Sequence, residues 1–464
     1  MEMKRCEHQQ MNRLSKRVLK TGMLLLMSLM FVFLAACGSS NGPNNAGNSG
    51  NSASRSPSDG GSAGSAGEEP KRVRVAAEAW MVEKLYVQQA VDKFAAENPD
   101  IEVELVPYAD PTVLSNFAIQ WSQGTTDADV VIIDGSSNAA QFLTKDLIYD
   151  FNELNFFEGE TAREHFVGNS LSFGELNGVQ FAIPISLETY AINANKKMFE
   201  AAGLTDENGE IILPKDWNEI YEYAKKMTIK EGDKVVQQGM TIQWGPNALY
   251  TLISTLKAET GSFYDENGVL TVDSPEIREI LEIWKKGADE GVFSTDTFTN
   301  KDAGRNNYKA DQVAMLFESG SRAPESAPTI GEENATVIPV PGMEENGSFA
   351  FAAGIVIPKA SESPNLAVKF LREALMSEEI QVGMASDWGK LPVINKYYDL
   401  IDADWKDTLH AIIEKSETTP MYRDLPVIVK ETPVELQKYL TGEQDLDSFF
   451  NNMQKLIDNA NKEV

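Results

Sequence analysis

The sequence has 464 residues, of which 42% are hydrophobic and 9% aromatic, with 41 cationic and 70 anionic side chains and a formal net charge of −29. A chain this acidic, without a basic stripe, is not expected to bind nucleic acid or anionic lipid headgroups through its charge. Its length exceeds what one hydrophobic core usually accommodates, so we expect two domains.

The N-terminal segment has the layout of a secretory signal. Six cations lie in the first twenty residues, fourteen mostly apolar residues follow (TGMLLLMSLMFVFL), and Ala35 and Ala36 come next. The apolar run is shorter than the roughly 20 residues that a membrane-spanning helix needs, which favours a cleaved signal over a retained anchor. Either Met1 or Met11 is the start of this signal.

The end of the segment, Leu34-Ala35-Ala36-Cys37, resembles the lipobox of bacterial lipoproteins. The resemblance implies a diacylglyceryl group on the Cys37 sulfur and cleavage that makes Cys37 the first mature residue. Two acyl chains anchor a protein durably, whereas one does so only marginally. We therefore predict a signal peptide over residues 1–36 and a location on the extracellular face of the cell membrane.

Residues 37–70 are predicted to be the lipidated cysteine and a disordered tether rich in Gly, Ser and Asn, with an end-to-end distance of roughly 30 Å. Cys6 would be removed with the signal, so the folded body is expected to hold no disulfide. Seven cations and five anions precede position 71, which leaves 34 cations and 65 anions, a net charge of −31, on the body.

Beyond position 70, strand-like and helix-like segments alternate. This alternation predicts βαβ units and a mostly parallel sheet. The first predicted strands are 73–80, 101–108 and 128–134, and the helices between and after them are 85–98, 113–124 and 137–148. Later strands are 178–185, 189–195, 313–319, 336–341 and 353–358, with helices at 218–227 and 275–291.

Several short motifs do not indicate cofactor chemistry. The glycines of Gly383–Lys390 are one residue too far apart for a phosphate loop. The two Asp-Glu-Asn-Gly segments at 206–209 and 265–268 lack the ligands of a calcium loop and predict turns. The three histidines have no metal-ligand spacing, and no catalytic nucleophile motif is present. We therefore expect no cofactor, no metal and no catalytic residue.

The order of the segments resembles the extracellular solute-binding proteins, family 1, the sugar-type receptors of bacterial ABC importers that include the maltose-binding type. The resemblance is carried by residues 174–204, 214–227, 308–322, 337–381 and 389–393. This sequence departs from the family's pattern at Ala128-Asp129, Ala194-Asn195 and Gly320-Ser321-Arg322, where Pro-Asp, Tyr-Asn and Gly-Pro followed by Trp are usual. These departures argue against maltose as the specific ligand.

The resemblance implies an α/β fold of the type II periplasmic-binding-protein kind, with two lobes that are each a mostly parallel sheet flanked by helices. The N-terminal lobe would comprise 71–184 plus about 337–358, and the C-terminal lobe about 185–336 plus 359–464. The crossover strands would lie near Ile183–Ser186, Thr336–Val340 and Pro358–Ala360. A mono- or oligosaccharide would bind in the cleft of a monomeric receptor, not an enzyme, and separate permease subunits would recognise the closed form.

Candidate ligand contacts are aromatic and planar polar side chains near strand ends, since a sugar presents CH-rich faces and hydroxyl edges. They are Glu78, Trp80, Asp134, Ser136, Glu188, Tyr190, Trp244, Ser321, Arg322, Phe351 and Trp388. The resemblance favours Glu188 and Trp244 among these. Packing stays the alternative role for Trp80, helix capping for Asp134, and a solvated charge for Arg322.

Two other functions stay open. A receptor for a non-sugar solute, such as a polyamine or a peptide-like molecule, would suit the acidic surface. A secreted glycoside hydrolase would need paired carboxylates, which no motif locates among 65 acidic residues.

Overall fold

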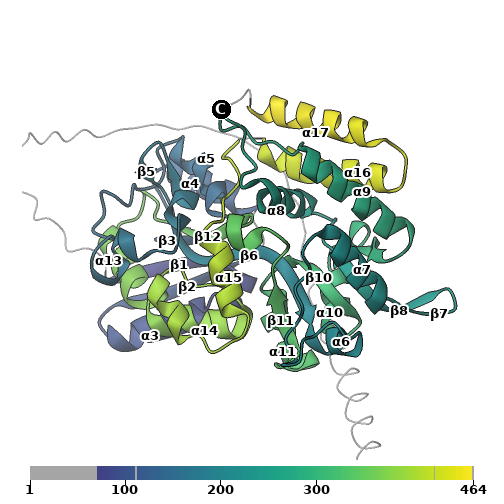
Figure 1. Ribbon diagram of the computed structural model, residues 1–464. Coiled ribbons are helices and arrows are strands. Elements are labelled where there is room, and N and C mark those ends of the chain that lie inside the picture. Colours follow the sequence, from purple (N-terminus) through teal and green to yellow (C-terminus); the bar gives the residue numbers. More distant parts are fainter. Residues whose placement is uncertain (1–70, 110–111, 423, 462–464) are drawn as a thin grey trace, which may run out of the picture. The chain divides into compact units, whose positions relative to one another are not determined.

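The structure is a computed structural model that describes residues 71–109, 112–422 and 424–461 (Figure 1). The predicted signal, Cys37 and the tether lie outside the described residues. Within these ranges, every helix is too short or too polar to cross a membrane.

Ten strands form one mixed sheet in the order β2-β1-β3-β12-β6-β10-β8-β7, with β11 paired to β6 and β9 to β8. The strands β1, β2 and β3 are mutually parallel, whereas β12 runs antiparallel to β3 and β6. The strand bounds are β1 Arg72–Glu78, β2 Glu102–Tyr108, β3 Val130–Ile133, β6 Ile183–Asn195, β7 Ile229–Glu231, β8 Lys234–Ile242, β9 Phe293–Ser294, β10 Val313–Ser319, β11 Ala335–Ile338 and β12 Ala350–Val356. A separate hairpin pairs β4 Glu175–Leu176 with β5 Val179–Gln180.

The strand β6 belongs to two parts of this sheet. Its 13 residues are all buried. Residues 183–189 pair with β12, and residues 190–195 pair with β10 and β11. We call β2, β1, β3 and β12 the N-terminal half-sheet, and β10, β8, β7, β9 and β11 the C-terminal half-sheet.

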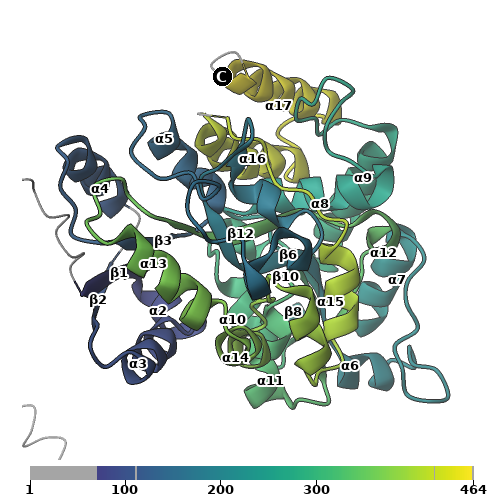
Figure 2. The same ribbon diagram turned by 90° about the vertical axis from the view of Figure 1, so that its left-hand side faces the viewer.

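Helices cover both half-sheets (Figures 1 and 2). The helix α3 buries residues spaced three and four apart, among them Val87, Ala90 and Phe94, as an amphipathic helix over a sheet should. On the N-terminal side lie α2 Ala79–Lys84, α3 Val87–Glu97, α4 Val113–Ser122 and α5 Ala140–Leu143. The middle of the chain forms α6 Lys196–Ala201, α7 Trp217–Met227, α8 Ala248–Thr260, α9 Pro275–Asp289, α10 Ala303–Lys309, α11 Arg322–Ile330 and α12 Met343–Asn346.

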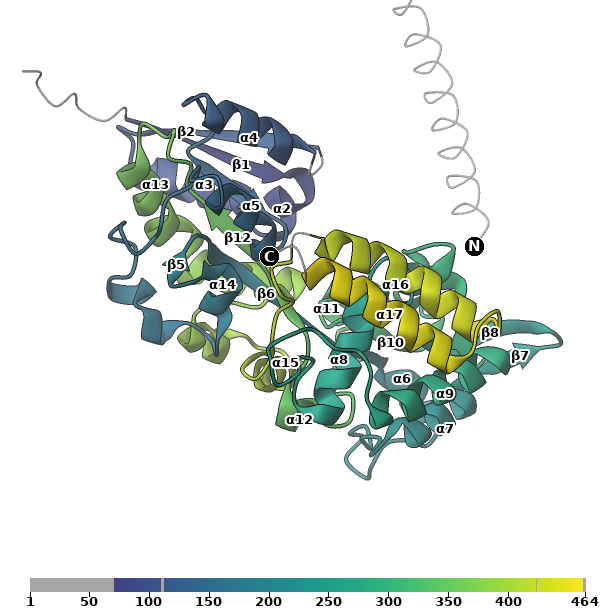
Figure 3. The ribbon, with the colours of Figure 1, turned by 90° about the horizontal axis from the view of Figure 1, so that it is seen from above.

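The C-terminal helices end in a hairpin that packs against α8 and α9 (Figure 3). They are α13 Pro364–Phe370, α14 Glu378–Trp388, α15 Lys406–Ile413, α16 Leu425–Leu440 and α17 Leu446–Asn461. The face of α16 that carries Ile428, Thr432 and Leu436 is buried. Since α8 is buried along nearly its whole length, it forms the base on which this hairpin lies.

Local signals explain several boundaries. Asp216 and Ser274 cap α7 and α9, accepting hydrogen bonds from the backbone N–H of Glu219 and Ile277. Both Asp-Glu-Asn-Gly segments form the predicted turns, in which Asp206 and Asp265 accept backbone N–H bonds. The predicted helix 137–148 is wrong in length, because α5 ends at Leu143 and Asp146 has a left-handed φ of 55° that no helix continues through.

The lobe boundaries drawn from the sequence stay a prediction. The structure adds one observation that bears on them: α13 contacts β1, and the π-helical turn Leu371–Leu375 contacts α3. Residues 364–375 therefore pack on the N-terminal half-sheet, whereas the predicted boundaries assign them to the C-terminal lobe.

Candidate ligand-binding cleft

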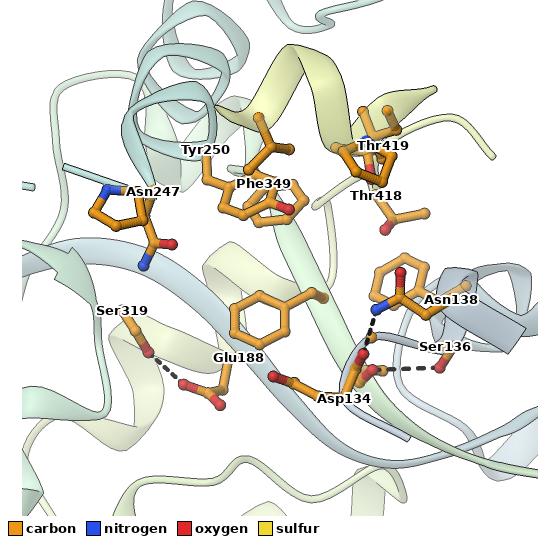
Figure 4. Close-up of a pocket in the computed structure, with 18 of the residues that line it drawn as sticks. Asp134, Ser136, Asn138, Glu188, Asn247, Tyr250, Ser319, Phe349, Thr418 and Thr419 are labelled. Carbon is orange, nitrogen blue, oxygen red and sulfur yellow. Dashed lines mark hydrogen bonds between the residues drawn. The ribbon is translucent and has the colours of Figure 1, made fainter. Parts of the chain in front are cut away.

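A cleft with a volume of about 1650 Å³ lies where the two half-sheets meet, and both contribute to its lining (Figure 4). Glu78 ends β1, and Asp134 directly follows β3. Glu188 comes from the shared strand β6, and Ser319 ends β10. The carboxyl ends of parallel strands are the usual position for ligands in α/β sheets, which explains why polar side chains gather here.

The floor of the cleft holds a buried ion pair. Lys390 Nζ donates to Glu188 Oε1 at 2.5 Å, while the hydroxyls of Ser319 and Ser321 donate to Oε2 at 2.7 and 3.2 Å. Burial alone would raise the pKa of Glu188, but the charges of Lys390 and Arg322 and these hydrogen bonds lower it to about 2. Glu188 is therefore a fixed anion whose two oxygens already have partners.

A second group of charges adjoins this floor. Arg322 binds Glu318 at 3.0 Å and Glu325 at 2.6 Å, and Arg305 binds the same Glu318 at 2.5 Å. Lys84, at the end of α2, reaches Glu325 on α11 at 2.5 Å. Because Glu318 is fully buried and lies between two guanidinium groups, its charge is compensated within the protein.

Two carboxylates in the cleft have no such partners. Neither Glu78 nor Asp134 forms a side-chain hydrogen bond or ion pair with any described residue, and the bond from Asn138 Nδ2 goes to the backbone oxygen of Asp134. The Asp134 side chain is exposed to solvent in the open cleft, but the surrounding protein restricts its hydration, and this restriction, followed by the negative charge of Glu188, raises its pKa to about 6. These carboxylates remain free to accept hydrogen bonds from a ligand.

Aromatic rings form another wall. The rings of Tyr250 and Phe349 stack with centroids 4.5 Å apart and planes within 5°, and Phe351 continues the stack at 5.9 Å. Trp80 is half-buried in the lining beside the floor, with Lys390 Nζ 5.6 Å from its ring centroid. Flat apolar surface and free carboxylates thus face the same space.

Of the eleven candidates from the sequence, eight line the cleft: Glu78, Trp80, Asp134, Ser136, Glu188, Tyr190, Arg322 and Phe351. Ser136 lies against β12, where a Cβ on Gly354 would approach its Oγ to 2.5 Å. Whether these residues contact a ligand stays a prediction.

Three candidates lie outside the lining. Trp244 is fully buried behind Phe298, on which its ring stacks at 5.6 Å, so Phe298 presents the aromatic surface there. Ser321 does not line the cleft itself, but its hydroxyl donates a hydrogen bond to Glu188, which does. Trp388, at the end of α14, packs beside the ammonium group of Lys84.

Several lining residues were not among the candidates, notably Tyr250, Phe298, Ser319, Phe349 and Lys390. Ser319 and Lys390 lie inside segments that carried the family resemblance, and the strand end at Ser319 was a usable signal. Among the described residues, no three His, Cys, Asp or Glu side chains are grouped so that they could hold a metal ion.

The chain is similar to a known protein family, to individual binding proteins and to solved structures. Residues 89–411 match the family described as bacterial extracellular solute-binding protein. A binding protein of Brucella abortus is 23% identical over 317 residues, which are 66% of this chain and 72% of the relative.

Solved structures give the same picture of the fold. The GacH receptor of Streptomyces glaucescens GLA.O, solved unliganded and with acarbose, is 18% identical with a TM-score of 0.69, over 83% of this chain and 98% of the receptor. Maltose-bound MalE3 of T. maritima is 18% identical with a TM-score of 0.67, over 85% and 100% of the two chains. The sugar-binding protein MalE of Xanthomonas citri is 16% identical with a TM-score of 0.69, over 84% and 97%. The predicted two-lobe α/β fold is confirmed.

Proposed function

The chain belongs to the bacterial extracellular solute-binding protein family, and from this premise we propose that it captures a carbohydrate in the cleft and delivers it to an ABC importer. Lipid on Cys37 would hold it at the outer face of the membrane, and permease subunits would be its partners. The structural relatives named with maltose or acarbose support the carbohydrate class.

The observation that carries the proposal is the combination of aromatic rings with unpaired carboxylates in one cleft. A sugar needs flat apolar surface for its CH face and anionic or amide oxygens for its hydroxyls. We propose that Trp80 and Phe351 supply stacking surface, and that Glu78 and Asp134 accept hydroxyl protons. Charge-assisted hydrogen bonds of this kind are about twice as strong as neutral ones.

A polyamine receptor is the second candidate, favoured by the same two unpaired carboxylates. The stacked rings and the cations that line the floor favour a sugar instead. A hydrolase is disfavoured because the matching family is one of binding proteins, and because Glu188, held as an anion by Lys390, has no proton to donate as a general acid. Asp134, whose pKa is raised to about 6, would be the general acid of such an enzyme, so saccharide turnover that is lost in Asp134→Asn would favour a hydrolase.

The test is isothermal titration of the full chain carrying Cys37→Ser against neutral saccharides, with spermidine in parallel. We expect one saccharide class to bind with a one-to-one ratio and Trp80→Ala to weaken that binding. The matched control is Trp388→Ala, which removes a nearby tryptophan outside the lining. Spermidine binding without saccharide binding, in a protein with intact circular dichroism, would overturn the carbohydrate assignment.

The anchor has a separate test. Cells that express the chain should incorporate radioactive fatty acid into it, and Cys37→Ser should abolish that label while ligand affinity stays unchanged. Label retained in the variant would contradict lipidation at Cys37.

A further inference from the structure

The cleft does not end at its floor but continues outward along α16. Lining residues on this helix include Leu425, Pro426, Val429, Pro433 and Val434. Their spacing of about four residues places them in one stripe. This stripe adjoins the buried face of α16: Leu425 and Val429 are partly buried against the hydrophobic core, whereas Val434 is 42% exposed. The helix therefore presents apolar side chains to the cleft as well as to the core.

The wall that faces this stripe is polar. It is lined by Asn138, Gln141 and Thr144, from the segment that contains α5, and Figures 2 and 3 both show α5 near the beginning of α16. The amide nitrogens of Asn138 and Gln141 donate to local backbone carbonyls. Their side-chain oxygens have no partner among the described residues and can accept hydrogen bonds.

The apolar stripe and the polar wall are poor partners for direct contact with each other. If they closed directly, amide groups would be buried against valine and proline without partners, at a cost of roughly 1–3 kcal/mol per group. A pyranose ring has the matching asymmetry, since its CH face suits the apolar stripe and its hydroxyls suit the amides. Lys145 and Lys430 are the charged lining residues of this outer part, and they disfavour a polycation there.

We propose that the space between α16 and the Asn138–Thr144 wall is a distal subsite for the outer units of an oligosaccharide, so that the ligand is an oligosaccharide and not a monosaccharide. This inference rests on the proposed carbohydrate function. The cleft volume of about 1650 Å³ supports it, because sites for single small ligands measure about 300–1,000 Å³.

The test measures affinity against chain length. The full chain with Cys37→Ser is titrated with gluco-, xylo- and manno-oligosaccharides from monosaccharide to hexasaccharide. We expect affinity in the bound series to rise beyond the disaccharide. Val429→Gln combined with Val434→Gln should lower the affinity for the longest ligand by about tenfold, because apolar surface that the ligand covers is lost. The affinity for the disaccharide should stay unchanged.

The matched control is Val427→Gln, on the same helix and 48% exposed, but outside the lining. Removing the amide of this wall that does not contact Asp134, with Gln141→Ala, should reproduce the length-dependent loss from the opposite wall. Equal affinity for short and long members of the series, or an equal loss for both in the α16 variant, would overturn the distal subsite and leave the carbohydrate function intact. Absence of binding to every saccharide would overturn both proposals.

Discussion

The floor of the cleft and its N-terminal wall both carry carboxylates, yet these behave in opposite ways. Glu188 on the floor is bound by Lys390, Ser319 and Ser321, and its pKa falls to about 2. Asp134 on the wall has no side-chain partner among the described residues, and its pKa rises to about 6. Charge in this cleft is therefore divided between groups that hold the protein together and groups left available for a ligand.

The largest expected effect comes from breaking the floor pair. Glu188→Gln leaves Lys390 buried without a counter-charge, and we expect a loss of about 3–5 kcal/mol in the free energy of unfolding, measured with urea. The double variant Glu188→Leu with Lys390→Met should recover most of that loss, because it removes both charges. A single variant that costs less than about 1 kcal/mol would contradict a structural role for the pair.

A substitution at Asp134, on the N-terminal wall, should change ligand affinity. Asp134→Asn removes an anionic acceptor, and we expect a loss of about 1.5–3 kcal/mol in the free energy of ligand binding, the scale of hydrogen bonds to charged groups. Titration calorimetry measures it, with a saccharide that binds the parent protein in the titration proposed above. Unchanged affinity would mean that the Asp134 carboxylate does not touch the ligand.

Although Asp134→Asn should weaken ligand binding, we expect it to increase the stability of the fold. Its pKa is raised from 3.8 to about 6 in the folded protein, so the folded state holds the proton more tightly and loses stability as pH rises through that window. Asp134→Asn should therefore stabilise the protein above pH 6 by about 1 kcal/mol, a value reduced for the solvent exposure of the side chain. The gain should vanish below about pH 4, and equal urea midpoints for variant and parent at neutral pH would refute it.

The smallest effect is expected at an exposed pair outside the cleft lining. Asp146 and Lys359 form an ion pair whose side chains are 85% and 40% exposed. Asp146→Asn should change the free energy of unfolding by less than about 1 kcal/mol and leave ligand affinity unchanged. A larger change would contradict the expectation that an exposed ion pair contributes much less to stability than the buried pair of Glu188 and Lys390.

Much of the fold was predictable because its signals are local. The buried run at 130–133 and the amphipathic pattern of α3 each follow from a few adjacent residues. Glu78 and Asp134 were found because polar residues at strand ends face the crevice. Lys390 was not predicted as a partner of Glu188, since the two residues are 202 positions apart and no local pattern joins them. Trp244 follows the end of β8, but its ring turns inward against Trp284, and the half-buried Phe298, from a distant segment, lines the cleft there.

The strand β12 has a consequence for how the chain is made. It closes the edge of β3 with residues that come much later, and the contacting residues Ser136 and Ala352 are 216 positions apart. Until those residues are in place the edge of β3 stays unpaired, and an unpaired edge recruits strands from other chains. A truncated chain that stops before residue 350 should therefore be insoluble, however well its earlier segments form.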